Sequence, residues 1–514
     1  MCGILAVLSH SPRGLPPDSR HRATRALAAI RHRGPNASVV HIDEQNQWVL
    51  GHVRLSIIDI GPASNQPFWS ACGRYALVFN GEIYNYIELR EELMTEGVEF
   101  FTNSDSEVLL QALIHWGNDA IARLNGMWAF VMLDRHEGAA VVSRDRWGVK
   151  PMYVHRTPDH TVIASEAKAI LAYEGRTFSP NRNAIVRHLR YTIGGESTES
   201  WFEEIERFPA AHWQVVPVAG SQQHVLGVAQ PLVRYWIYPS EESVFTLSDA
   251  VDHVDELLSD AVKIRLRSDV PVALSLSGGL DSSIIAWLVG QRYGQSLEAF
   301  TAWHGAREKS ELPVAEDIAN RFGHRLTPIA EANYGNTMEL VEHCVYHLDS
   351  GHGATAIVPY YQLCKAARRT AAVMLEGQGA DESFGGYTYM LPMAATDYLL
   401  RLRPLQAGMA AIVQLYADGV GPTFQSWAKY LFRHIYERQY LTWGHRILPR
   451  FDIAPGADEF LRIRLASSNL REQCVVRHRT GLANLLQYGD AISMSVNLET
   501  LSRSEVSTQV SKDA

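Results

Sequence analysis

The sequence predicts a mixed α/β protein with two domains. The first is expected to consist of packed β-sheets under helical covers, and the second of a parallel sheet with helices on both faces. The chain has 514 residues, which is more than a single hydrophobic core usually holds. Short alternating or continuous apolar runs dominate the first half, as in strands. In the second half such runs alternate with amphipathic stretches, a pattern typical of a parallel sheet.

The first half contains several segments with the pattern of strands. They are residues 3–8, 48–60, 75–85, 128–145 and 161–167. Apolar residues recur at helical spacing in residues 21–34 and 86–97, and both stretches end at glycine, a common helix stop. Residues 217–245 lose this periodicity and carry Gly, Pro and Ser. We therefore expect a first domain at residues 1–216 and a linker at 217–245.

The second domain is expected at residues 246–500. A long amphipathic helix is predicted over residues 247–269, followed by an apolar strand, a glycine-rich turn and a helix over 270–294. Further strand-like runs follow at residues 296–303, 324–330 and 371–382. Ligands of such sheets bind beyond the carboxyl ends of the strands. After residue 385 the pattern predicts helices only, and residues 501–514 are expected to form a disordered tail.

Composition excludes several classes of function. The net charge of −9 disfavours a duplex nucleic-acid binder, which normally carries a basic surface. The sequence shows no signal peptide and no apolar run long enough to span a membrane. Its five cysteines are odd in number and widely scattered, with no zinc-ligand spacing. This pattern predicts a cytoplasmic protein without a disulfide framework.

The cysteine behind the initiator methionine has two interpretations. Residue 2 is small, so we expect Met1 to be removed and Cys2 to carry a free α-amino group beside its thiol. Such an amine can accept the thiol proton during attack on a carbonyl. Alternatively, Cys2 is a chance cysteine before a buried strand. Residue 2 alone does not decide between them.

The run "LSLSGGLDSS" at residues 274–283 is the most specific local signal. Glycines let the backbone approach an anion, and amides at a helix N-terminus hold phosphate. Asp281 is a candidate magnesium ligand, and Asp381 after a second strand is a candidate partner. An ordinary strand-to-helix turn is the alternative. The run is no GxxxxGK[ST] loop, but it resembles the pyrophosphate loop of enzymes that cleave ATP to AMP and pyrophosphate.

An ordered set of motifs extends this resemblance over nearly the whole chain. They are "MCGI", "HRGPN", "RLSIID", "FNGEIYN", "SDSE", "RDRWGVKPMY", "SGGLDSS", "GQGADESFGGY" and "DAISMSVNLET". From Cys2 to about Glu499 the chain resembles a glutamine-dependent asparagine synthetase, a class II amidotransferase joined to an ATP pyrophosphatase domain. The resemblance implies a four-layer αββα Ntn-hydrolase domain followed by an adenine nucleotide α-hydrolase-like domain.

By the same resemblance, Cys2 is the nucleophile that attacks the glutamine amide, and Asn80 with the amide of Gly81 forms the oxyanion hole. Arg54 would bind the glutamine α-carboxylate. The glutamine-binding set implied by the motifs is Arg54, Leu55, Ser56, Ile57, Ile58, Glu82 and Asp105. The ATP-binding set is Ser275, Leu276, Ser277, Gly278, Gly279, Asp281, Ser282, Ala302, Glu376 and Gly377. Gln378 and Asp381 would face the acceptor and the intermediate.

The resemblance also implies the reaction and its partners. Ammonia released from glutamine would pass inside the protein to a second site, where ATP and Mg²⁺ convert the side-chain carboxylate of aspartate to an acyl-adenylate. Ammonia would then displace AMP to give asparagine. No nucleic-acid or membrane partner is expected. The family is often dimeric, so the resemblance allows a homodimer.

Three positions depart from the family pattern. Asn36 stands where the family usually has aspartate, and Gln378 stands where it commonly has glutamate. After Thr500 the expected "PFLD" motif is absent, which predicts a truncated and impaired synthetase half. Two alternatives therefore stay open: an amidotransferase of this architecture acting on another carboxylate, and a glutaminase or scaffold with a silent second half. Relatives that form β-lactams are disfavoured because Cys2 and the glutamine-site motifs are intact.

Overall fold

The computed structural model describes residues 2–191, 198–219, 230–237, 245–303, 311–330, 335–352, 356–384, 386, 391, 395, 398 and 402–418. These residues fall into two compact units. The larger unit contains those up to residue 181 and those from 198 to 377. The smaller unit contains residues 182–191 and those from 378 onward. The predicted tail at 501–514 lies outside the described residues.

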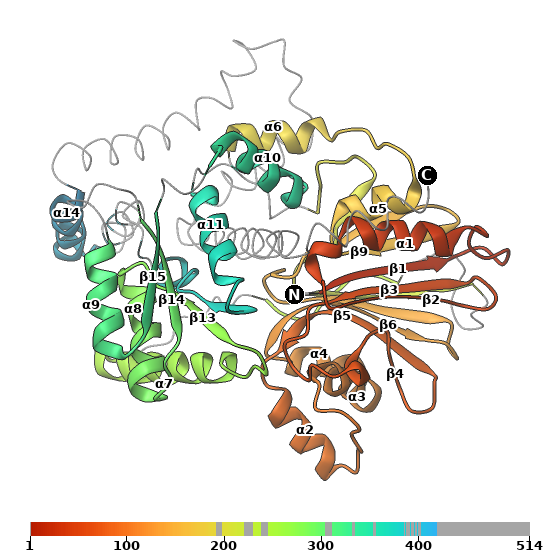
Figure 1. Ribbon diagram of the computed structural model, residues 1–514, viewed down its shortest axis with the longest axis horizontal. Helices are drawn as coiled ribbons and strands as arrows, with labels where there is room; N and C mark the ends of the chain where they lie inside the picture. The colour runs from red at the N-terminus through yellow and green to blue at the C-terminus, as the bar shows by residue number, and fades with distance from the viewer. Residues whose placement is uncertain are drawn as a thin grey trace. The chain divides into compact units, whose positions relative to one another are not determined.

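Two antiparallel sheets of six strands form the first half of the chain (Figure 1). The first has the order β10-β8-β9-β1-β3-β2. Its strands are β1 (Gly3–Ser9), β2 (Ala37–Ile42), β3 (Trp48–Arg54), β8 (Tyr153–Arg156), β9 (His160–Ala164) and β10 (Ile205–Arg207). The second has the order β12-β11-β7-β6-β5-β4. Its strands are β4 (Phe68–Trp69), β5 (Tyr75–Ile83), β6 (Gly126–Asp134), β7 (Ala139–Arg144), β11 (His212–Pro217) and β12 (Val233–Arg234).

Alternation along β1 shows how the layers form. Ile4 and Ala6 pack with Val131 in the core between the two sheets, whereas Leu5 and Val7 point to the outer face, toward the helices. Figure 1 shows α1 and α5 over one sheet and α2, α3 and α4 over the other. These helices are α1 (Ser19–Ala29), α2 (Tyr86–Thr95), α3 (Asp105–Trp116), α4 (Ala120–Arg123) and α5 (Ala167–Glu174). The expected four-layer αββα architecture is confirmed.

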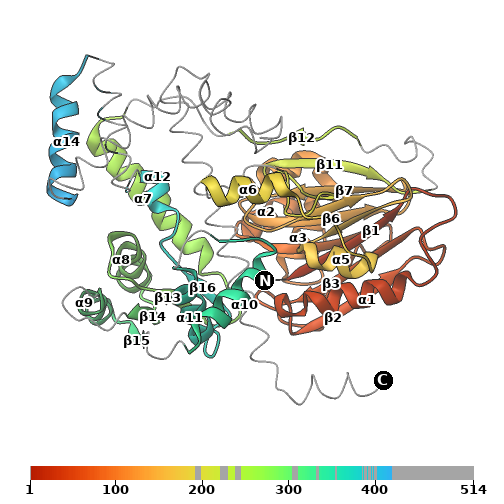
Figure 2. The same ribbon diagram turned by 90° about the horizontal axis from the view of Figure 1, so that it is seen from above.

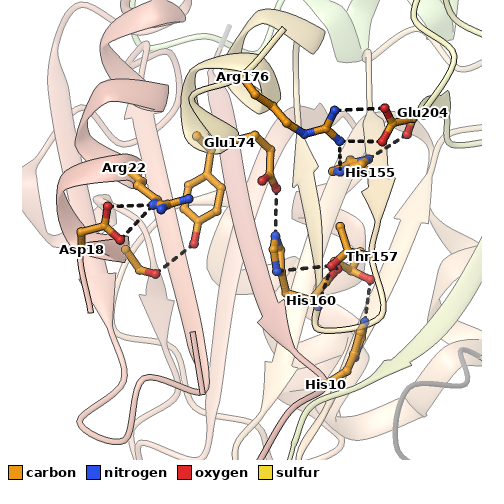
Figure 3. Close-up of polar contacts among 12 residues, drawn as sticks. His10, Asp18, Arg22, His155, Thr157, His160, Glu174, Arg176 and Glu204 are labelled. Atoms are coloured by element: carbon orange, nitrogen blue, oxygen red, sulfur yellow. Dashed lines mark hydrogen bonds and ion pairs between the residues drawn. The ribbon is translucent and has the colours of Figure 1, made fainter. Parts of the chain in front are cut away.

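Polar contacts tie α5 to the edge of the first sheet (Figure 3). His160 in β9 pairs through Nε2 with Glu174 Oε1 at the end of α5, at 2.8 Å. Arg176, just beyond α5, pairs with Glu204 before β10. His10, after β1, bonds Thr161 at 2.8 Å. The first two contacts hold the C-terminal end of α5 against the strands of this sheet.

The second half is built around a parallel sheet with the order β15-β14-β13-β16. Its strands are β13 (Val272–Ser275), β14 (Glu298–Trp303), β15 (Arg325–Ala330) and β16 (Val373–Leu375). The helices of this region are α7 (Leu247–Arg265), α8 (Leu280–Trp287), α9 (Leu312–Phe322), α10 (Thr337–Leu348) and α11 (Ile357–Ala367), with a π-helix at Leu288–Arg292. Those of the smaller unit are α6 (Arg182–Tyr191), α12 (Ala380–Phe384) and α14 (Pro404–Asp418).

Strand β13 is covered on both faces, as Figure 2 also shows for the sheet. Leu274 packs with Ala286 of α8 and Ala315 of α9. Ala273 faces the other way and packs with Leu363 of α11. A short strand buried on both sides explains why its sequence is apolar rather than alternating. The predicted parallel sheet with helices on both faces is confirmed, while the domain boundaries 1–216 and 246–500 stay predictions.

Several predicted elements end earlier than their sequence pattern, and two of them meet beyond their ends. The strand predicted over 48–60 ends at Arg54, and the helix predicted over 247–269 ends at Arg265. The residues beyond each end bind one another instead. Asp269 N donates to Ile57 O at 3.0 Å, and the backbone N of Asp59 donates to an oxygen of the Asp269 carboxylate at 2.7 Å. No described helix is both long and apolar enough to cross a lipid bilayer.

Candidate active sites

Cys2 lies directly before β1, where the first sheet meets the loop after β3. Its thiol donates to the carbonyl oxygen of Leu55, with Sγ 3.7 Å from that oxygen. Its own carbonyl oxygen accepts from Arg33 Nε at 3.1 Å. Cys2 is 9% exposed, and burial raises the pKa of its thiol. A thiol that is protonated at neutral pH is a weak nucleophile, so attack from this position requires a nearby base.

A pocket at Cys2 is bordered by β3, β5 and the start of α3. Its lining residues are Cys2, Arg54, Leu55, Ile57, Ile58, Gln66, Phe79, Gly81, Glu82, Ser104, Asp105 and Ser106. The structure thus brings together every residue expected at the glutamine site except Asn80 and Ser56, which do not line this pocket. Segments far apart in sequence converge here, because β3 and β5 lie in the two stacked sheets.

Asn80 and Gly81 are neighbours in β5. Asn80 is fully buried, and within the described part of the chain neither its Nδ2 nor its Oδ1 has a hydrogen-bond partner. Leaving a buried amide unpaired is costly, so such a group indicates that a ligand supplies the partner. A Cβ at Gly81 would lie 2.1 Å from the carbonyl oxygen of Met127, so no larger residue fits. Glycine at this position therefore lets β5 lie close to Met127 of β6.

Arg54, at the end of β3, is buried and partly committed to the protein. Its Nη1 donates to Gly61 O at 2.7 Å and to Asn65 Oδ1 at 2.9 Å, and its Nη2 donates to Asp59 O. A guanidinium has five N–H donors. Among the described contacts, the N–H groups of Arg54 that have no partner lie on Nε and Nη2, along one edge of the planar guanidinium. This edge suits bidentate binding of a carboxylate.

Two buried carboxyl groups face the same pocket. Burial, and after it the neighbouring Asp105, raises the pKa of Glu82 to about 7. Burial also raises the pKa of Asp105 to about 6, although Ile83 N donates to its Oδ2 at 3.1 Å. Two carboxyl groups with raised pKa values mark a place where a cationic group of a ligand would stabilise their ionised forms.

Sequence reasoning missed part of the pocket wall. Gln66 accepts from Phe79 N at 2.6 Å and donates to Ser106 Oγ at 3.2 Å, so its side chain fixes the wall between β5 and α3. Ser104 caps α3 by accepting from Ser106 N at 3.1 Å. The cap was readable, because Ser104 and Glu107 have the spacing of a capping box before an apolar run. Nothing in the local pattern singles out Gln66.

Ser56 directly follows Leu55 of the pocket wall, and its role at glutamine stays a prediction. Its backbone N donates to Asn36 Oδ1 at 3.0 Å, and it lines a second pocket with Val270 and residues 368–372. An amide oxygen at Asn36 accepts this bond as a carboxylate would. The change from aspartate to asparagine therefore keeps the contact.

The predicted phosphate loop lies between β13 and α8. Gly278 has φ of +87°, and Ser277 Oγ accepts from Gly279 N at 3.2 Å. Ser282 Oγ lies 3.1 Å from Ser277 Oγ and accepts from Ser277 N at 3.3 Å. The loop precedes the first turn of α8, where free amides and the helix dipole favour an anion. Its hydroxyl groups bond one another, and the loop itself is partly exposed.

The end of β16 meets this loop directly. A Cβ at Gly377 would lie 2.9 Å from both Asp281 Cβ and Ser282 N, so glycine is required for the contact. Burial raises the pKa of Glu376 to about 7, and Tyr360 Oη donates to its Oε1 at 3.3 Å. Ala302 lies one strand away, near the end of β14. Ser275 and Leu276 lie at the end of β13. The residues expected at the ATP site are therefore found at the carboxyl ends of three strands, β13, β14 and β16.

Gln378 and Asp381 belong to the smaller unit, whereas Asp281 belongs to the larger one. Asp381 O accepts from Gly386 N at 2.9 Å. No group of three or more His, Cys, Asp or Glu side chains with metal-ligand geometry exists among the described residues. Carboxylates such as Asp281 are nevertheless suitable ligands for Mg²⁺, which takes one or two of them together with substrate phosphates.

Comparison with known proteins covers both halves. A family model described as a glutamine amidotransferase domain matches residues 1–226, and one described as asparagine synthase matches residues 253–501. A putative glutamine-hydrolysing asparagine synthetase of Methanocaldococcus jannaschii is 30% identical over 425 residues, covering 78% of each chain.

This chain covers a smaller share of two further relatives, and one of them carries a different name. A putative glutamine-hydrolysing asparagine synthetase of Mycobacterium bovis is 32% identical over 448 residues, covering 82% of this chain. The chain spans 66% of the length of that relative. A protein of Gibberella zeae named an amidase is 30% identical over 420 residues, covering 75% of this chain and 59% of the relative. With both domain families matched in order, the chain belongs to the glutamine-hydrolysing asparagine synthetase family.

Proposed function

We propose that this protein hydrolyses glutamine at Cys2 and uses the ammonia for an ATP-driven amidation of a carboxylate, with aspartate as the acceptor. One observation carries the proposal. The Cys2 pocket offers a group for each end of glutamine: the free edge of Arg54 for the α-carboxylate, and the buried carboxyls of Glu82 and Asp105 for the α-ammonium. The carboxamide would then lie at Cys2.

The first step follows from the state of the thiol. Because burial raises its pKa, Cys2 is protonated at neutral pH and needs a base. Its own α-amine, free once Met1 is removed, is attached to the same residue and is the base that we assign to this step. The amine takes the Sγ proton as Sγ attacks the amide carbon. The proton then goes to the leaving nitrogen, the C–N bond breaks, and ammonia and a thioester result. Water hydrolyses the thioester to glutamate.

The oxyanion formed during attack needs donors already in place. Asn80 Nδ2 is buried without a described partner, and the neighbouring Gly81 lines the Cys2 pocket. A buried amide that gains its hydrogen bond only as negative charge develops stabilises the transition state more than the ground state.

The second half supplies a nucleotide site. Amides and hydroxyls of Ser277–Ser282 would bind the pyrophosphate of ATP, while Glu376 and Gly377 border the same strand ends. Asp281 and Asp381 are the residues that would hold Mg²⁺, which offsets phosphate charge when bound. The aspartate carboxylate would attack the α-phosphorus and release pyrophosphate, and ammonia passing inside the protein would displace AMP. The domain boundaries and a cytoplasmic homodimer belong to this proposal.

A second candidate function is amidation of a different carboxylate. Gln378 stands where the family commonly has glutamate, so a charge expected near the acceptor is absent. The relative named an amidase shows that close sequences carry other names. The change predicts an acceptor without an amino group at the place where that glutamate would act.

One experiment separates these candidates. Purified protein is incubated with glutamine, ATP and Mg²⁺ and a panel of carboxylates, and glutamate, AMP, pyrophosphate and amide product are quantified. Aspartate-dependent AMP with asparagine supports the main proposal, and another acceptor supports the second. Glutamate without AMP from any acceptor leaves only glutaminase activity, which is the third alternative. The Cys2→Ala variant with ammonium chloride is the control, because it isolates the second half.

A further inference from the structure

A chain of buried polar contacts connects the backbone of Cys2 with the end of helix α10. Arg33 donates from Nε to the Cys2 carbonyl oxygen at 3.1 Å and from Nη1 to Glu166 Oε1 at 2.8 Å. Lys168 donates from Nζ to Glu166 Oε2 at 2.5 Å and to Asp349 Oδ1 at 3.0 Å. Hydrogen bonds thus run without a break from the nucleophile to Asp349. All these residues lie in the larger unit.

The Asp349 carboxylate contacts both the side chain and the backbone of Lys168. Asp349 directly follows α10 with a left-handed φ of 50°, and its Oδ2 accepts from the backbone N of Lys168 at 3.2 Å. The Lys168 and Asp349 side chains are 9% and 7% exposed, so solvent screens their contact little. The segment that carries Asp349 belongs to the half with the phosphate loop, whereas Lys168 begins α5 beside the first sheet.

Helix α10 makes a second contact with the same group. The ring of His347 lies edge to face against His32, with centroids 4.3 Å apart. His32 precedes Arg33 and bonds through Nε2 to Glu166 Oε1 at 2.9 Å. Both residues of the turn behind Cys2 are therefore held by Glu166, and Glu166 is held by Lys168. The position of this turn depends on where α10 ends.

Charged side chains of both signs meet in this group. Two cations, Arg33 and Lys168, face two carboxylates, Glu166 and Asp349. Burial alone would raise the pKa of Glu166, but His32, Lys168 and Arg33 hold it well below its usual range. Removing one charge would leave another buried without its counterpart, and the remaining side chains would rearrange.

We propose that Asp349 is a positioning residue for glutamine hydrolysis, supplied by the half of the chain that carries the phosphate loop and acting through Lys168, Glu166 and Arg33 on the backbone of Cys2. The inference rests on the proposed glutaminase function. It adds that the Cys2 site is completed by a residue outside its own domain family match, since Asp349 lies within residues 253–501.

A purely structural contact between the halves would behave differently. Arg267 and Glu88 form such a contact, with Arg267 Nη1 2.7 Å from Glu88 Oε2, and Arg267 also donates to Tyr84 O. Glu88 is largely exposed and neither residue bonds the turn behind Cys2 within the described contacts. The pair is therefore a matched control, since it joins the same two halves without reaching the nucleophile.

The test compares Asp349→Asn, Asp349→Glu and Glu88→Gln in the full chain, with glutamine hydrolysis measured as glutamate release and folding checked by thermal denaturation. For Asp349→Asn we expect kcat to fall on the order of tenfold or more, because small displacements of a reacting group are costly. KM should stay within about twofold, because Arg54, Glu82 and Asp105 are untouched. Asp349→Glu keeps the charge and should recover part of kcat. Glu88→Gln should leave kcat within about twofold.

Each outcome of this test either supports or overturns the inference. A folded Asp349→Asn protein with wild-type kcat overturns the inference and leaves the glutaminase function standing. Equal losses in Glu88→Gln and Asp349→Asn also overturn it, because any contact between the halves would then suffice. If Asp349→Asn does not fold, Asp349→Glu decides alone: an unchanged kcat contradicts positioning, and a several-fold loss at constant KM supports it. A wild-type protein that releases no glutamate overturns the proposed function itself.

Discussion

The Cys2 pocket and the loop before α8 recognise charge in opposite ways. At Cys2 the polar groups are buried, and several have unmet hydrogen-bonding capacity: the amide of Asn80, one edge of Arg54, and the carboxyls of Glu82 and Asp105. In the loop, Ser277 and Ser282 already bond each other and the surrounding backbone, and the loop is partly exposed.

This difference indicates which groups determine the ligand specificity of each site. Buried groups whose hydrogen-bonding capacity is only partly met by the protein favour a ligand that matches them, so on the proposed assignment the Cys2 pocket would select one small zwitterion. A phosphate loop binds through backbone amides and a helix dipole, which recognise charge and not identity. The proposal therefore places the choice of acceptor elsewhere, and Gln378 in the smaller unit is one of the positions where this chain departs from its family pattern.

The largest effect is expected from removing the nucleophile. Cys2→Ala should lower glutamine hydrolysis by about four orders of magnitude or more, because no other group can form the thioester. Ammonia-driven amidation should remain, since its residues lie on the strand ends of the other sheet. Glutamate release and amide formation are measured side by side. Cys72→Ala is the control, because Cys72 is exposed and lies outside the pocket. Undiminished glutamate release from Cys2→Ala would refute the assignment.

The next effect tests whether the unpaired amide at Asn80 matters. Asn80→Ala should lower kcat for glutamine by about 10²- to 10³-fold with a small change in KM, as when an oxyanion donor is lost. Asn85→Ala is the control. Its side chain donates to Arg123 O and accepts from Asn125 N at the far end of β5, so kcat should change less than about twofold. A kcat for Asn80→Ala near the wild-type value would mean that the buried amide has another purpose.

Much of this contrast was predictable from sequence. Periodicity predicts the two kinds of sheet, and most residues that line the Cys2 pocket lie in the sequence motifs. Gln66 was missed because its role depends on contacts with β5 and α3 that no local pattern encodes. Ser56 lines a second pocket with Val270, where the chain has left β3 at Arg54, and its role at glutamine stays a prediction. Contacts such as Lys168 with Asp349 join residues far apart in sequence, and only the fold reveals them.

A smaller effect should come from the exposed loop. Asp281→Asn should lower ATP–pyrophosphate exchange by about 10- to 100-fold, because it removes a charge from a site where a metal ion would dominate the local field. Glutamine hydrolysis should not change, which would sharpen the separation between the two sites. Asp260→Asn on the exposed side of α7 is the control for charge alone. Normal exchange in Asp281→Asn would remove Asp281 from the proposed metal site.

The smallest effect concerns pH and the two buried carboxyls. On the proposed assignment both groups would bind the glutamine ammonium only when ionised, and burial raises the pKa of Glu82 to about 7. Between pH 8 and pH 6 its ionised fraction falls roughly tenfold, so glutamine should bind up to about tenfold more weakly at the lower pH. Calorimetry on Cys2→Ala measures this binding without turnover.

The control for this titration is Cys2→Ala combined with Glu82→Gln, which should bind glutamine more weakly at pH 8. Its remaining pH dependence should be shallower and lie near pH 6, where Asp105 titrates with a pKa of about 6. The sign is the decisive part: a raised carboxyl pKa means that affinity is lost as pH falls, because protonation removes the charge that holds the ammonium. Binding that is constant from pH 6 to pH 8 would show that these carboxyls do not contact the ammonium. The buried groups at Cys2 would then select their ligand by shape and not by charge.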